Sequence, residues 1–243
     1  SGNGENLVAQ DFYGALRAPD AVAAEIKDIG HVAKVLSWGR WTNGSIAIGN
    51  DKQAAQLLDA NSNVHYLIGL PTATSAIPNL GSVTYSLAGG TSTALFGTTT
   101  GSSNDIGQVK TGSFTVDFAN ASTALSVNIG GFTKASNLNT LNINGNGLLT
   151  AGENSFSFNN MNVSATDANQ NPLSCTNCTA NANGMFFGSV NTLNNSSLTA
   201  PTAAGLTYSV TGTVKATQDT TIQVNGTAAF ANPTPTPQNN QEI

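Results

Sequence analysis

The chain has 243 residues, a formal net charge of -5 and a charged fraction of only 9%, against about 25% in an average soluble protein. Its eight basic residues are scattered singly, which excludes a nucleic-acid surface, and polar residues or glycine interrupt every apolar stretch, which excludes a transmembrane helix. Hydroxyl and amide side chains replace charge, as is typical of secreted or cell-surface bacterial β-proteins.

Residues 1–60 are predicted to form a helix-containing packing element. Val22, Ile26 and Ile29 recur at helical spacing. Pro19 suits the first helical turn and Gly30 the residue after the last one. A short strand is expected near 46–48, followed by one or two helical turns within 51–59.

The apolar side chains of residues 19–48 are too numerous to leave in water, and a short helix cannot bury them alone. This segment is therefore expected to pack against the rest of the chain or against a neighbouring copy.

Residues 61–231 are predicted to form one antiparallel β-domain. Apolar residues alternate with polar ones in segment after segment, and turn residues separate the segments. The predicted strands are Val64–Gly69, Val83–Leu87, Gly112–Phe118, Thr123–Ile129, Leu138–Ile143, Ser155–Val163, Gly184–Val190, Leu206–Val214 and Thr220–Phe230.

The alternation predicts which side chains face the interior: Phe114, Val116, Phe118, Leu125, Val127 and Ile129. Because no long amphipathic helix interrupts the strands, the chain is assigned to the all-β class, as an up-and-down antiparallel barrel of about eight strands. A β-sandwich is the alternative. Two segments are expected outside the barrel, namely a loop or disordered excursion from Thr91 to Ser103 and a Pro-rich tail over 232–243.

The two cysteines, Cys175 and Cys178, are separated by two residues. Their polar flanks indicate a loop between strands, where a disulfide is expected. A zinc site would lack half of its ligands because no second such pair exists. Free thiols and a redox function remain alternatives.

Four residues are candidates for ligand binding. Trp38 and Trp41 flank Arg40, and this cluster could stack on a ligand or cover one end of the barrel. His65 beside Tyr66 suggests haem ligation, but consecutive strand residues point to opposite faces. His65 is therefore also interpreted as a hydrogen-bonding strand residue.

No catalytic constellation, metal site or cofactor is predicted. Both histidines lie within the first 65 residues, which disfavours a nucleophilic triad. The acidic residues fit turns or solvated faces better than the paired carboxylates of a glycosidase.

Four segments, 38–41, 65–72, 83–91 and 112–118, together resemble the C-terminal β-region of bacterial FecR-domain surface proteins. The later segments 184–188 and 204–208 are similar to a repeated pattern of transferrin-binding protein B-like barrels. This resemblance implies an eight-stranded surface barrel preceded by a small packing element. Members of that barrel class bind host proteins or haem, or have no assigned ligand.

The sequence thus predicts a non-enzymatic binding module, secreted or on the outer-membrane surface of a Gram-negative bacterium. Its protein partner or small ligand is expected at the barrel-end loops. The alternatives are a structural subunit that forms a homo-oligomer or filament, and a haem-binding surface protein.

Overall fold

A computed structural model describes residues 25–32, 34–47, 55–58, 63–98, 101–133, 137–150, 153–193, 197–215 and 219–235. The described residues form strands and one short 3-10 helix, η1 (Thr74–Ala76). No helix among them is long and apolar enough to span a membrane. Five short strands precede η1: β1 (Glu25–Val32), β2 (Leu36–Thr42), β3 (Gly44–Ala47), β4 (Ala55–Leu58) and β5 (Val64–Gly69).

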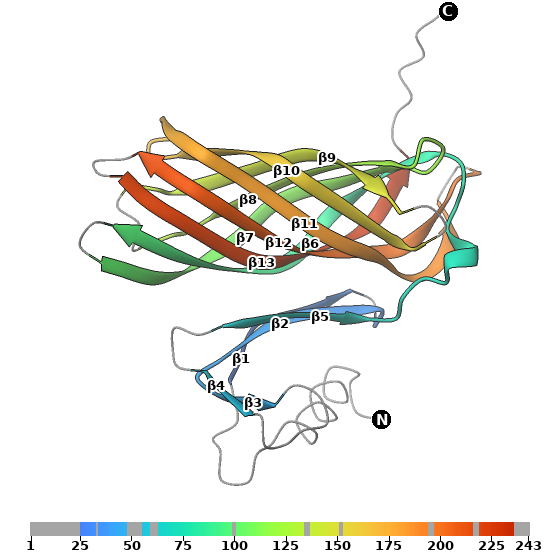
Figure 1. Cartoon of the computed structure of the whole chain (residues 1–243). Helices are drawn as coiled ribbons and strands as arrows, with labels where there is room; N and C mark the ends of the chain where they lie inside the picture. Colours follow the sequence, from blue (N-terminus) through green and yellow to red (C-terminus); the bar gives the residue numbers. More distant parts are fainter. Residues whose placement is uncertain are drawn as a thin grey trace, which may run out of the picture.

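Eight longer strands follow and close into a barrel (Figure 1). Each pairs antiparallel with its neighbour in the chain, and the last strand pairs with the first, so the topology is up-and-down. The predicted barrel is confirmed. Its strands are β6 (Ser82–Thr98), β7 (Gly101–Asp117), β8 (Ser122–Gly130), β9 (Thr140–Leu149), β10 (Ser155–Thr166), β11 (Pro172–Thr192), β12 (Thr199–Lys215) and β13 (Asp219–Pro235).

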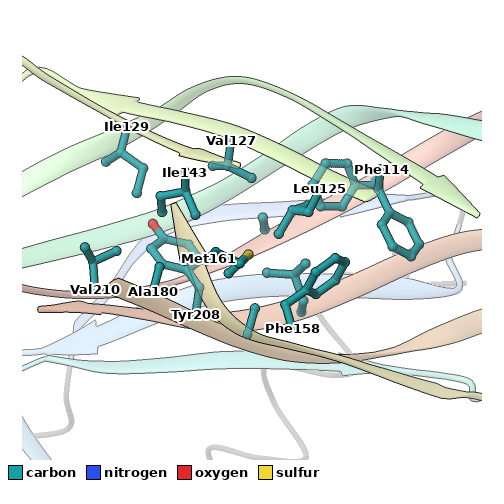
Figure 2. Close-up of a cluster of buried hydrophobic side chains, with 14 of the residues drawn as sticks. Phe114, Leu125, Val127, Ile129, Ile143, Phe158, Met161, Ala180, Tyr208 and Val210 are labelled. Carbon is teal, nitrogen blue, oxygen red and sulfur yellow. The ribbon is translucent and has the colours of Figure 1, made fainter. Parts of the chain in front are cut away.

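The barrel interior is filled by apolar side chains. All six residues predicted to face inward are buried in one cluster, and Figure 2 shows Phe114, Leu125 and Val127 converging there. The ring of Phe114 stacks on that of Phe156, with centroids 4.5 Å apart. This interior is a packed core, which is the usual outcome for an eight-stranded barrel.

The predicted N-terminal helix is wrong for the residues that the structure describes. Residues 25–32 form β1, which pairs antiparallel with β2, and β5 completes a three-stranded sheet in the order β1-β2-β5. We call it the small sheet. Pairing with β2 overrides the weak local helical spacing, and Ile29 is 59% exposed rather than packed. Val22 and the start of the predicted helix lie outside the described residues.

The predicted helical turns within 51–59 are also wrong for the described residues of this range, because Ala55–Leu58 forms β4, which pairs with β3. Where the structure describes it, the expected loop from Thr91 to Ser103 instead consists of the paired ends of β6 and β7, and Ala94 and Phe96 belong to the buried core. The Pro-rich tail begins later than predicted, since Thr234 and Pro235 still pair with β6.

Cys175 and Cys178 form a disulfide, but it lies within β11 rather than in a loop between strands. The pairing of β11 with β12 shifts register between Thr176 and Thr179. The bond therefore closes a β-bulge, in which Asn177 adopts a positive φ of 52°.

Candidate functional site

The small sheet packs on the side of the barrel, over β6, β12 and β13 (Figure 1). The expectation that this element covers a barrel end is therefore wrong. Its inner face contributes Leu36, Trp38 and Leu67, which meet small barrel residues. Ala203 and Ala229 are completely buried by this contact. Small residues on the outer barrel surface let the second layer approach closely.

Trp38 is the largest side chain in this contact and packs between the two layers. Its side chain is 5% exposed, and its indole lies between Gly30 of the small sheet and Gly89 of β6. A methyl group at either glycine would overlap the six-membered ring of the indole. Both positions are glycine because the indole occupies the space that a side chain at either position would need.

Arg40 lies two residues further along the same face and is also buried. Its Nε donates to the Asp28 carboxylate at 2.8 Å, and its guanidinium also donates to the Asn63 side-chain oxygen. Asp28 has a positive φ of 53° and lies where β1 shifts register against β2. This bulge aims the carboxylate at the arginine, so Arg40 is part of a structural ion pair.

Trp41 does not join Trp38. The two residues are three positions apart on β2, so they point to opposite faces of the small sheet. Trp41 stacks on Tyr66 of β5, with ring centroids 4.4 Å apart and an interplanar angle of 29°. The predicted tryptophan pair is thus divided between two surfaces.

His65 joins the small sheet to the barrel through hydrogen bonds. Its Nδ1 lies 2.7 Å from the Thr91 hydroxyl and its Nε2 lies 2.8 Å from the Thr93 hydroxyl. Thr91 in turn lies 2.8 Å from the hydroxyl of Thr227 on β13. The chain of hydrogen bonds runs from β5 across β6 to β13.

The pKa of His65 is lowered to about 4, first by burial and then by the nearby positive charge of Arg40. Its imidazole is therefore neutral at physiological pH, with one ring nitrogen donating and the other accepting. Since both nitrogens are engaged with threonine hydroxyls, iron ligation would require breaking this network. The geometry gives the haem alternative no support.

A groove of about 330 Å³ opens beside His65. His65 of β5 forms one side, and the floor is the outer surface of β11, β12 and β13. The lining is composed of amide, hydroxyl and imidazole groups together with backbone: His65, Asn181, Asn183, Thr207, Tyr208, Ser209, Asn225 and Gly226. We call this feature the polar groove.

The register of the barrel explains why these residues meet. Asn183, Thr207 and Thr227 are successive partners across β11, β12 and β13, and Thr91 on β6 completes that row. A second row is formed by Asn181, Ser209, Asn225 and Thr93. The next row in the other direction, Met185, Gly205, Ala229 and Gly89, is apolar or glycine. The outer surface therefore changes from apolar under the small sheet to polar in the groove.

The groove suits binding of a neutral polar group. Of the residues that the structure describes, no Asp, Glu, Lys or Arg lines it, and its histidine is uncharged. Among the described residues, no group of three or more His, Cys, Asp or Glu could hold a metal ion. Hydrogen bonding, rather than charge or nucleophilic attack, is the chemistry that this lining offers.

Of the four sequence candidates, Trp38, Arg40 and His65 share the inner face of the small sheet, and only His65 reaches the groove. The asparagines and hydroxyl residues of the floor were missed. Their one signal in the sequence was that they occupy the polar positions of alternating strands. Polar residues occupy such positions in every strand of the barrel, so the signal does not single out the groove.

No protein family and no curated protein matches the chain. Similar solved structures include transferrin binding protein B from Haemophilus parasuis Hp5, in a point-mutant form, and isotype 1 transferrin binding protein B from serogroup B Neisseria meningitidis. Each is 14% identical, with TM-scores of 0.38 and 0.37 over 82% and 89% of this chain.

The chain spans only 33% and 36% of those two proteins. Similarities this weak decide neither ligand nor partner. They do not show the expected relation to FecR-domain proteins.

Proposed function

We propose that the chain is a non-enzymatic binding module, secreted or on the surface of a Gram-negative bacterium, and that it holds its ligand in the polar groove. The observation that carries this proposal is the contrast between the inside and the outside of the barrel. Phenylalanine and aliphatic side chains fill the interior, whereas the groove is an open recess whose polar lining is uncharged.

The sequence placed the ligand at the barrel-end loops. The groove is a better site because its floor consists of paired strands. Side chains on such a floor are held in place by the sheet, so less conformational entropy is lost when a ligand binds. Low overall charge and abundant Asn, Ser and Thr support an extracytoplasmic location.

A pair of matched variants tests whether the groove binds. Thr207 and Ser126 are both exposed on outward-facing positions of barrel strands, and β12 and β8 lie on opposite sides of the ring. Thr207→Arg would fill the groove, while Ser126→Arg places the same side chain on the far side.

The purified 243-residue chain is screened against a random peptide library, a saccharide array and haemin. The proposal predicts at least one ligand whose binding is abolished by Thr207→Arg and preserved by Ser126→Arg. Binding that both variants leave unchanged, or no binding by any of these probes, would overturn it.

A further inference from the structure

β5 borders the polar groove through His65, and one edge of this strand is open. Among the described strands β5 pairs only with β2, so its other edge has no strand partner within the described part of the chain. Immediately beyond β5, the amide of Leu70 donates to the carbonyl of Val35 at 2.9 Å, whereas the carbonyl of Leu70 accepts from the Gly188 amide of β11 at 2.8 Å. The edge is therefore open along β5 and closed by β11 after its last residue.

The bond between Leu70 and Val35 fixes which backbone groups of β5 face β2 and which face the open edge. In an antiparallel ladder, hydrogen-bonded and non-hydrogen-bonded pairs alternate. Because the Val35 carbonyl points toward β5, the carbonyls of Ser37 and Gly39 do so too, and their partners Ile68 and Tyr66 direct their amides and carbonyls toward β2. Those of Leu67 and His65 therefore point away from β2, toward the open edge.

The floor beside this edge has a matching character. Asn183 and Thr207 lie in one row, and Asn181 and Ser209 lie in the next. Side-chain amides carry both a donor and an acceptor, as peptide groups do. The Asn181 side-chain oxygen already accepts from the Asn160 amide at 3.0 Å, which leaves its NH2 group as a donor. Together with Asn183, Thr207 and Ser209, the floor therefore offers both donors and acceptors beside the edge of β5.

We propose that the occupant of the polar groove is an extended, uncharged polypeptide segment that adds a strand to the open edge of β5. This inference rests on the proposed function and names its ligand class. The incoming backbone bonds to the amides and carbonyls of His65 and Leu67. Its small polar side chains lie on the asparagine and hydroxyl floor.

Two observations favour a peptide over a saccharide. Saccharide sites commonly use an aromatic face for stacking, but the Tyr208 ring is buried in the barrel core, and its hydroxyl donates to the Thr91 carbonyl of β6. Trp41 and Tyr66 stack on the opposite face of the small sheet. An unpaired strand edge, in contrast, is complementary to another peptide backbone.

The uncharged character of the described lining also restricts the peptide. A Lys, Arg, Asp or Glu side chain laid on the floor would lose hydration without gaining an opposite charge. Serine, threonine and asparagine side chains would replace their hydration by hydrogen bonds to the floor, and glycine has no side chain to desolvate. The preferred ligand is thus an uncharged segment about as long as β5, which has six residues.

The test uses the intact chain and six-residue peptides selected from a random library, followed by a scan in which each peptide amide is N-methylated in turn. Strand addition predicts an alternating pattern, because only every second amide of an added strand bonds to β5. Methylation at those positions should weaken binding about tenfold or more, and methylation at the others should have little effect.

The outcomes separate this inference from the function on which it rests. An alternating pattern that is lost with Thr207→Arg and kept with Ser126→Arg supports both. A saccharide that binds with the same sensitivity, while no peptide does, keeps the binding function and overturns strand addition. Peptide binding with a uniform methylation profile also overturns strand addition. If no probe is sensitive to Thr207→Arg, both proposals fail.

Discussion

Acidification should weaken the fold through His65, because this residue is held neutral in the folded chain. Its folded pKa is about 4, against 6.5 without perturbation. Between these two values the unfolded chain binds a proton that the folded chain does not. The free energy of unfolding therefore falls as the pH is lowered from about 6.5 toward 4, and the contribution of His65 levels off below that.

The size of this effect follows from the width of the window. Each pH unit between the two pKa values contributes about 1.4 kcal/mol, so the full loss approaches about 3 kcal/mol. The imidazole is mostly buried between β5 and the threonines of β6, which limits screening by solvent. Arg40 acts in the same direction, because its positive charge opposes a second one nearby.

The assay is urea unfolding of the wild type and His65→Gln at a series of pH values. Glutamine retains hydrogen-bonding capacity for Thr91 and Thr93 but does not titrate in this range. Carboxylates that do not interact with His65 contribute equally to both curves and cancel in the difference. The unfolding free energy of the wild type minus that of His65→Gln should be constant above about pH 6.5 and should fall steadily below it. A difference that stays flat down to about pH 4.5 would refute this assignment.

Further predictions concern the packing of the small sheet and the disulfide. Trp38→Ala should lower the free energy of unfolding by about 3–5 kcal/mol. A loss below about 1 kcal/mol in urea titrations would show that the indole does not hold the small sheet on the barrel. Gly89→Ala should cost about 1–3 kcal/mol by overpacking, whereas the exposed neighbour Ala88→Ser should stay within about 0.5 kcal/mol of wild type. Replacing Cys175 and Cys178 together by serine should cost no more than about 2 kcal/mol, because the closed loop is short. A larger loss by thermal or urea unfolding would mean that the disulfide also stabilises parts of β11 outside the bulge.

The barrel was predictable because alternation is local. Phe114, Val116 and Phe118 mark an inward face within a single strand, and the same pattern recurs along the chain. The limits of β5 were predicted correctly as Val64–Gly69. In the segment after Thr91, Ser92, Ala94 and Phe96 also alternate inward, but small and polar residues gave too little apolar contrast to show a strand.

The helix in place of β1 was an error of a different kind. Ile26 and Ile29 do have helical spacing, yet pairing with β2 and the accommodation of Trp38 beside Gly30 decide the conformation. Those contacts are made by residues on other strands. A short segment with weak local preference takes the conformation that its tertiary partners require.

The polar groove could not be found from the sequence, because its residues meet only through register. Asn183, Thr207 and Thr227 are neighbours as a result of the pairing of three long strands. A shift of one residue in either pairing would turn these side chains to the other face. His65 alone carried a sequence signal, and its role is to join β5 to the threonines of β6.

Amide hydrogen exchange at β5 tests the central claim most directly, because it monitors the open edge itself. Without peptide, the amides of His65 and Leu67 should exchange much faster than those of Tyr66 and Ile68, which bond to β2. A bound peptide should slow exchange at His65 and Leu67 about tenfold or more, while Tyr66 and Ile68 change little. Slow exchange at all four amides in the free chain, or no added protection at His65 and Leu67 when peptide is bound, would contradict strand addition at this edge.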